Sequence, residues 1–142
     1  MVRAAVRAGV GTMLLSLALL SSASRARADD RPTDVACPAV GPIIEARVAE
    51  DVAIDRDRLL RLLRVELAAR NIGLCVGPAP RKSVATIDLA PHEADVTLTI
   101  HVTDRLTQKD VTRDVPVGAY PPDARPLLVA AAMDELLRAS WS

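Results

Sequence analysis

The sequence predicts an α+β fold, a two-layer sandwich in which two helices pack on one face of a mostly antiparallel sheet of 3–5 strands. Two observations predict it. Apolar and polar residues alternate with the period of a strand through residues 83–117, and the segments 56–70 and 124–140 repeat apolar residues with the period of a helix. Each helix then has one apolar stripe and the sheet one apolar face, so both helices are expected on the same side. The expected order along residues 43–142 is strand, helix, three strands, helix.

The first strand and the first helix are expected within residues 43–70. Residues 43–51 alternate in the manner of a strand, with Ile44, Ala46 and Val48 on one face and Glu45 and Arg47 on the other. Asp55 is a residue type that caps helix N-termini, and Gly73 suits a left-handed exit after the helix. The buried face is expected to consist of four leucines, Leu59, Leu60, Leu63 and Leu67. Glu66 and Arg70 have the spacing of a surface ion pair.

Further strands are expected at residues 74–76, 83–89, 96–103 and 109–117, with turns at 90–93 and 104–108. The third of these has the clearest alternation, with Val96, Leu98, Ile100 and Val102 pointing inward. Such alternation is typical of antiparallel strands with one solvated face.

The last helix is expected to begin after two prolines and to end near residue 140. Asp123 is the expected N-cap, and Pro126 falls in the first turn, where a missing N–H is tolerated. The apolar stripe consists of Val129, Ala132, Met133, Leu136 and Leu137, and the opposite face of Asp134, Glu135 and Arg138.

Residues 1–28 have the three-part pattern of a cleavable signal peptide. Arg3 and Arg7 precede an apolar run over residues 10–20, and Ala26 and Ala28 place small side chains at the −3 and −1 positions of a cleavage site. Two arginines behind the run, Arg25 and Arg27, suit a membrane anchor better, but the run is shorter than the ~20 residues that span a bilayer. We expect a signal peptide over 1–28, an irregular leader over 29–42 and one domain over 43–142. The mature protein is then periplasmic or secreted, with no direct membrane anchor.

The mature chain has two cysteines, Cys37 and Cys75. In an oxidising compartment an even pair is most simply a disulfide. A free thiol and a metal site are the alternatives, and the two histidines lie far from both cysteines along the chain.

Composition narrows the classes of partner. Loss of the signal removes four arginines and no acidic residue, which turns a balance of 18 basic and 18 acidic residues into a net charge of −4. A mildly acidic domain without a basic cluster is not expected to bind nucleic acid. With no Phe, one Tyr and one Trp, stacking on sugars or bases is nearly excluded.

No catalytic, cofactor-binding or metal-binding motif is present in the sequence. The candidate polar binding face is the outward side of the sheet, with Asp88, Thr97, Thr99, His101 and Thr103. His101 as a general base would need a nucleophile and an orienting carboxylate, for which Asp88 is the candidate. His92 lies in a predicted turn near Glu93 and Asp95, fewer ligands than a convincing zinc site needs.

Four segments together show a resemblance to a known domain: "ELAARNIGLC", "VATIDLA", the hairpin "DVTLTIHVTDRLTQKDVTRDVPV" and the closing "LVAAAMDELLRASW". Over residues 44–142 this pattern resembles the N-terminal α+β domain of TolB-type periplasmic proteins, and the ending is similar to that of short exported proteins of unknown function. The chain departs from the TolB type in lacking a following β-propeller, in having Gln108 where Gly is usual, and in its two cysteines. The resemblance implies an envelope adaptor or binding module and assigns no particular residue.

Three functions follow as hypotheses. The leading one is a non-enzymatic protein-binding module of the cell envelope, whose partner is another envelope protein. The second is a periplasmic protein that binds a small ligand or an ion, and the third is an enzyme.

Overall fold

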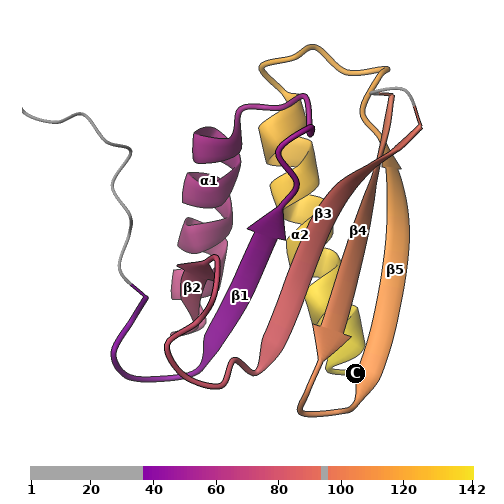
Figure 1. Cartoon of the computed structure of the whole chain (residues 1–142). Helices are drawn as coiled ribbons and strands as arrows, with labels where there is room; N and C mark the ends of the chain where they lie inside the picture. The colour runs from indigo at the N-terminus through magenta and orange to yellow at the C-terminus, as the bar shows by residue number, and fades with distance from the viewer. Residues whose placement is uncertain (1–36, 94–95) are drawn as a thin grey trace, which may run out of the picture. The chain divides into compact units, whose positions relative to one another are not determined.

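A computed structural model describes residues 37–93 and 96–142. The elements within these residues are β1 (Ile43–Val48), α1 (Arg56–Ala68), β2 (Gly73–Val76), β3 (Ala85–Glu93), β4 (Thr97–Asp104), β5 (Lys109–Pro116) and α2 (Arg125–Ser140). Their order is the predicted one, with the short strand expected at residues 74–76 as a fourth strand between the helices, and the predicted α+β class is confirmed (Figure 1).

The strands form one five-stranded sheet in the order β2-β1-β3-β4-β5. β1 pairs in parallel with β2 over four residue pairs and with β3 over five, whereas the β3–β4 and β4–β5 pairings are antiparallel and eight pairs long each. The sheet is therefore mostly antiparallel, with a parallel part around β1. β5 and β2 are its two edges.

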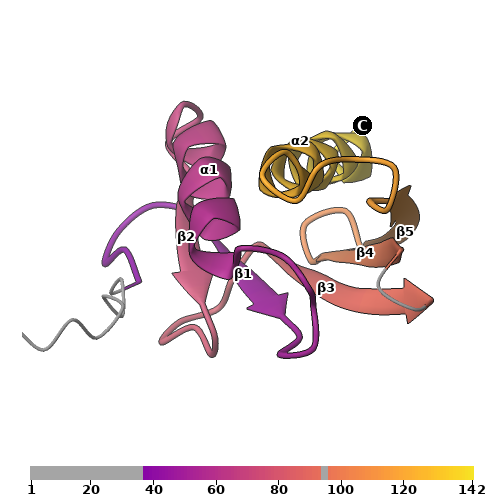
Figure 2. The same cartoon turned by 90° about the horizontal axis from the view of Figure 1, so that it is seen from above.

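Both helices lie on one side of the sheet, as Figure 2 shows when the sheet is seen from above. α1 lies over the β2–β1 side and α2 over the β4–β5 side. The apolar stripes of the helices and the inward side chains of the strands form one core, which includes all four expected leucines of α1 and all five expected apolar residues of α2. In the part of the chain that the structure describes, no helix covers the other side of the sheet.

The start of α1 is as predicted, but its exit differs. The Asp55 carboxylate accepts a hydrogen bond from the Arg58 amide at 2.9 Å, which caps the helix. The left-handed residue after the helix is Asn71, with φ of 58°, and not Gly73. Gly73 is needed for another reason: a Cβ there would collide with the Pro38 ring of the leader. Asn is the residue that tolerates the left-handed region best after Gly.

The turn expected at residues 90–93 is instead the end of β3, with a register irregularity between Pro91 and Glu93. Pro91 is tolerated here because its backbone nitrogen, which has no N–H, is on the side of β3 that faces β1. The β1–β3 pairing ends at Val48 and Leu89, so no ladder hydrogen bond is lost.

Two further expectations about local structure are wrong. Val96 is 51% exposed, because β4 begins at Thr97 and the Val96 carbonyl instead accepts hydrogen bonds from the Val117 and Gly118 amides. The N-cap of α2 is Ala124, without a side-chain hydrogen bond, and not Asp123. Pro126 is in the first turn as predicted. The N–H groups of the first turn have no partner within the helix, so a proline there leaves one fewer donor for a cap to satisfy.

The predicted signal peptide, with Ala26 and Ala28 at its cleavage site, lies outside the described residues, as does most of the leader. Among the residues that the structure describes, no helix is both long and apolar enough to cross a membrane.

Candidate functional site

Residues 37–42 of the leader are held against β2. Cys37 and Cys75 form the predicted disulfide, with their Cα atoms 4.7 Å apart. The Arg81 guanidinium adds hydrogen bonds to the carbonyls of Pro38, at 3.4 Å, and of Gly41. The pair is compatible with an exported protein, since disulfides persist in oxidising compartments.

The strand registers bring the predicted polar residues together on the open face of the sheet. Asp88 of β3 lies opposite His101 of β4, and Thr103 and Thr99 flank that histidine on the same face. Thr97 is at the end of the same row, opposite Glu93. The threonines and His101 are half-buried, because neighbouring strands cover their flanks.

Two aspartates of β5, which the sequence analysis did not single out, complete this face. Asp110 accepts a hydrogen bond from Thr103 at 2.7 Å and lies 3.5 Å from Nε2 of His101. Asp114 accepts one from Thr99 at 2.6 Å and lies 3.9 Å from Nδ1 of His92. The alternation of residues 109–117 would have predicted these two aspartates on the open face, because Asp110, Thr112 and Asp114 alternate with the inward valines.

The carboxylate beside His101 is therefore Asp110 and not Asp88. Asp88 is 3.9 Å from the Arg47 guanidinium, which also pairs with Glu45 at 2.7 Å. The hydrogen bond and the charge of Glu45 raise the pKa of Arg47. On this face imidazoles, carboxylates and hydroxyls contact one another. Within residues 37–93 and 96–142, no three His, Cys, Asp or Glu side chains are grouped to hold a metal ion.

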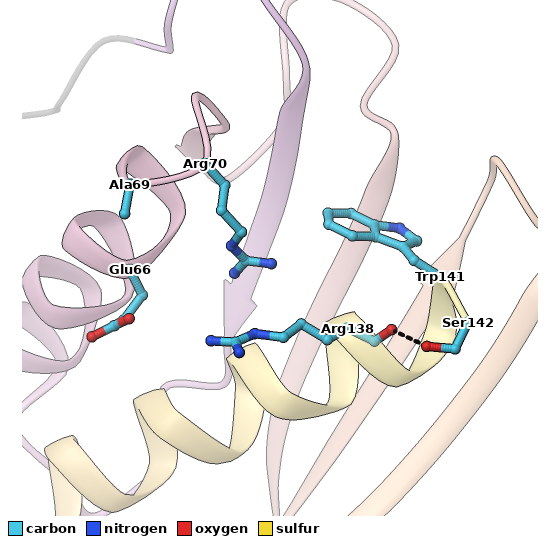
Figure 3. A pocket seen from close by; sticks show the side chains of 6 residues that line it. All are labelled: Glu66, Ala69, Arg70, Arg138, Trp141 and Ser142. Carbon is cyan, nitrogen blue, oxygen red and sulfur yellow. Dashed lines mark hydrogen bonds between the residues drawn. The ribbon is translucent and has the colours of Figure 1, made fainter.

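A shallow hollow of about 520 Å³ lies between the C-terminal ends of the helices, lined by Glu66, Ala69, Arg70, Arg138, Trp141 and Ser142 (Figure 3). Beneath it is Asp134, which was expected on the solvent face of α2 but is 3% exposed. Its carboxylate pairs with Arg70 of the α1 exit and with Arg138 one turn along α2. Arg70 thus pairs across the helices, and not with Glu66 as expected.

This network joins α1 to α2. The Arg70 guanidinium lies 5.8 Å from the centre of the Trp141 ring, and both its burial and the Arg138 charge lower its pKa. Both guanidiniums pair with the Asp134 carboxylate, and Glu66 adds a second negative charge to the lining, so positive and negative charges of the hollow offset one another. We therefore assign it a structural role.

A second buried carboxylate, Asp104, fixes the β4–β5 turn against the end of α2. It accepts hydrogen bonds from the Leu106 amide, at 2.8 Å, and from the Thr107 hydroxyl, which also lies 3.0 Å from the Ser140 carbonyl. Burial acts to raise the pKa of Asp104, but the hydrogen bonds outweigh it and hold the pKa below its usual value. The turn also holds Gln108 in the left-handed region, with φ of 58°, a conformation that Gly adopts more readily.

Another hollow, of about 330 Å³, lies between α2 and the edge strand β5. We call it the β5 groove. Its lining combines apolar residues, of which Val115 and Ala132 are buried, with three charged ones: Arg113, Asp114, Val115, Pro116, Tyr120, Leu128, Ala131, Ala132 and Glu135. Arg113 and Glu135 form an ion pair at 2.6 Å across it. Tyr120 is 43% exposed, although a large apolar ring is usually buried.

Comparison with known proteins adds no assignment: no protein-family model and no curated protein matches this chain.

Proposed function

We propose that this chain is an exported, non-enzymatic protein-binding module of the cell envelope, periplasmic or secreted, whose partner is another envelope protein. The observation that carries the proposal is the free edge of β5. This strand is eight residues long and pairs with β4 on one side, and within residues 37–93 and 96–142 no strand pairs with its other side. A long exposed edge presents unpaired N–H and C=O groups that accept a strand from another chain.

Two other features support the proposal. The chain begins with the three-part pattern of an export signal, and its disulfide suits an oxidising compartment. The apolar residues that line the β5 groove lie beside the free edge, so that side chains of an added strand have a place to pack.

The proposal that the chain is exported is tested by mass spectrometry of the protein recovered from the producing cells. We expect a chain beginning at Asp29, with both cysteines resistant to alkylation until a reductant is added. A chain that retains Met1 and has two free thiols would show that it stays in the cytoplasm.

The binding part is tested by crosslinking in the producing cells. A photoreactive residue replaces Thr112, on the free edge of β5, in the full-length chain, and Ala68, exposed on α1, serves as the matched control position. We expect one defined protein adduct from position 112 and none of that mass from position 68. Equal adducts from both positions, or none from position 112, would reject protein binding through this edge.

The alternative, a small-ligand or ion-binding protein, is supported by the His101–Asp110 and His92–Asp114 contacts of the open face. A ligand specific to this face raises the melting temperature in a thermal-shift screen, and the rise is lost in His101→Ala. We rank it second because no three His, Cys, Asp or Glu side chains within residues 37–93 and 96–142 are grouped to hold an ion.

A further inference from the structure

We propose that the β5 edge binds an extended segment of a different protein that carries basic residues four positions apart on one face and apolar residues on the other. This inference rests on the proposed binding function and names the chemistry of the partner.

The pairing of β5 with β4 determines which of its backbone groups are free. The Val117 amide donates to the Val96 carbonyl at 2.8 Å, so these opposed residues form a hydrogen-bonded pair. In an antiparallel ladder such pairs alternate, which directs the backbone groups of Val111, Arg113 and Val115 toward β4. Those of Asp110, Thr112 and Asp114 then point outward and are available to an incoming strand.

The side chains of the outward residues set the charge of the partner. Asp110 and Asp114 lie on the open face of the sheet, with side chains 65% and 51% exposed, and each carboxylate accepts a single hydroxyl hydrogen bond. A carboxylate has about four acceptor sites, so both retain capacity for a cation. Directly opposed residues of opposite charge stabilise a strand pair. Lys or Arg is therefore expected opposite both aspartates, four residues apart in the partner.

The other face of the incoming strand lies above the β5 groove. A partner residue opposite Val115 points toward Leu128, Ala131 and Tyr120, which line the groove. Since this surface is apolar, an apolar side chain is expected there. Alternating basic and apolar residues are also the pattern that forms a strand.

In the registers that keep most of β5 paired, a second copy of the chain does not meet these requirements. When two copies of β5 pair in antiparallel fashion through their outward backbone groups, one residue of β5 lies opposite the same residue of the other copy. We call that residue the centre of the pairing. For every centre within residues 111–114, like charges become opposed: Lys109 faces Arg113, Asp110 faces Asp114, or Arg113 or Asp114 faces its own copy. Opposed like charges destabilise a strand pair, which favours a different partner.

The test measures binding of two capped peptides to the full-length chain recovered from the producing cells. The peptide VKVTVKV has the expected pattern and reads the same in both directions, so it presupposes no strand orientation, and VEVTVEV is its charge-reversed control. We expect VKVTVKV to bind at least tenfold more tightly. The double variant Asp110→Lys/Asp114→Lys should reverse this preference.

Two controls separate the edge from general effects. Glu50→Lys/Asp51→Lys makes the same charge change at exposed positions away from β5 and should keep the preference for VKVTVKV. Thr112→Pro removes an outward N–H and should weaken binding at least tenfold, whereas Thr112→Val keeps that N–H and should not. If the lysine variant does not fold, Asp110→Asn/Asp114→Asn should abolish the preference between the peptides.

Several results would overturn the inference: equal binding of both peptides, no binding of either, a preference unchanged in the β5 variants, or a concentration-dependent dimer by sedimentation. Slow exchange of the Thr112 amide in the free monomer would also overturn it, because the edge would then be covered by the chain itself. If crosslinking from position 112 succeeds while the peptides fail, the binding function stands and only the partner chemistry is wrong.

Discussion

The disulfide gives the sharpest prediction about stability. The change is Cys37→Ala combined with Cys75→Ala. Alanine is chosen because Cys75 is fully buried, and a serine there would add the cost of burying a hydroxyl without a partner. The double variant removes the cross-link and leaves the core otherwise nearly intact.

The expected loss follows from the size of the closed loop. The cysteines are 38 residues apart, and for such a loop the chain-entropy model gives about 4 kcal/mol of stabilisation. The contacts of Arg81 and Gly73 with the leader are expected to loosen as well, because the leader is then held by those contacts alone. For a domain of about 100 residues, 4 kcal/mol corresponds to a melting temperature lower by about 15–25 °C.

The assay is urea unfolding followed by circular dichroism, with and without reductant. We expect the oxidised wild type to be the most stable, and the reduced wild type to match the double variant to within about 1 kcal/mol, since both lack the cross-link. The double variant should not respond to reductant. If oxidised and reduced wild type unfold at the same urea concentration, the reasoning is refuted.

Three further predictions concern single side chains. Because the hydrogen bonds that Asp104 accepts lower its pKa in the folded state, its stabilisation is present above the unfolded pKa of about 3.9 and is lost as the pH falls through the folded value. Wild type should therefore exceed Asp104→Asn in urea midpoint at pH 7, and a gap that persists unchanged to pH 2 would contradict this. Gln108→Gly should stabilise the protein by up to about 1 kcal/mol, because Gly adopts the left-handed region without strain, and a lower melting temperature would count against it. Arg70→Met leaves the buried Asp134 carboxylate paired with Arg138 alone and should cost about 1–3 kcal/mol, less than for a fully buried pair because Arg70 is 28% exposed. Adding Asp134→Leu should recover most of that loss in a double-mutant cycle, and additive losses would show that the pair is not coupled.

The sequence was sufficient for features that depend on local pattern. Helical spacing identified the buried leucines of α1, Asp55 was recognised as a cap, and alternation placed His101 and the threonines on the open face. The expected compartment and the cysteine count were enough to predict the disulfide. Each of these rests on near neighbours in the chain or on composition.

The features that were missed depend on packing between distant segments. Asp134 was read as solvent-exposed, because nothing near it in the sequence shows that Arg70 arrives from the other helix to pair with it. Gly73 was assigned to the helix exit because its contact with Pro38 exists only after the leader folds back. Likewise, β3 continues through Pro91 because β1 ends at Val48, which only the sheet order reveals.

Amide hydrogen exchange of the complex tests the central claim, that the β5 edge takes up a strand from a partner, most directly. The protein captured by crosslinking from position 112 is added to the wild-type chain, and exchange is followed residue by residue. We predict that the outward amides of Thr112 and Asp114 slow at least tenfold, while the Arg113 amide, already bonded to β4, changes little. A complex that forms while Thr112 and Asp114 exchange at their free rates would contradict the claim.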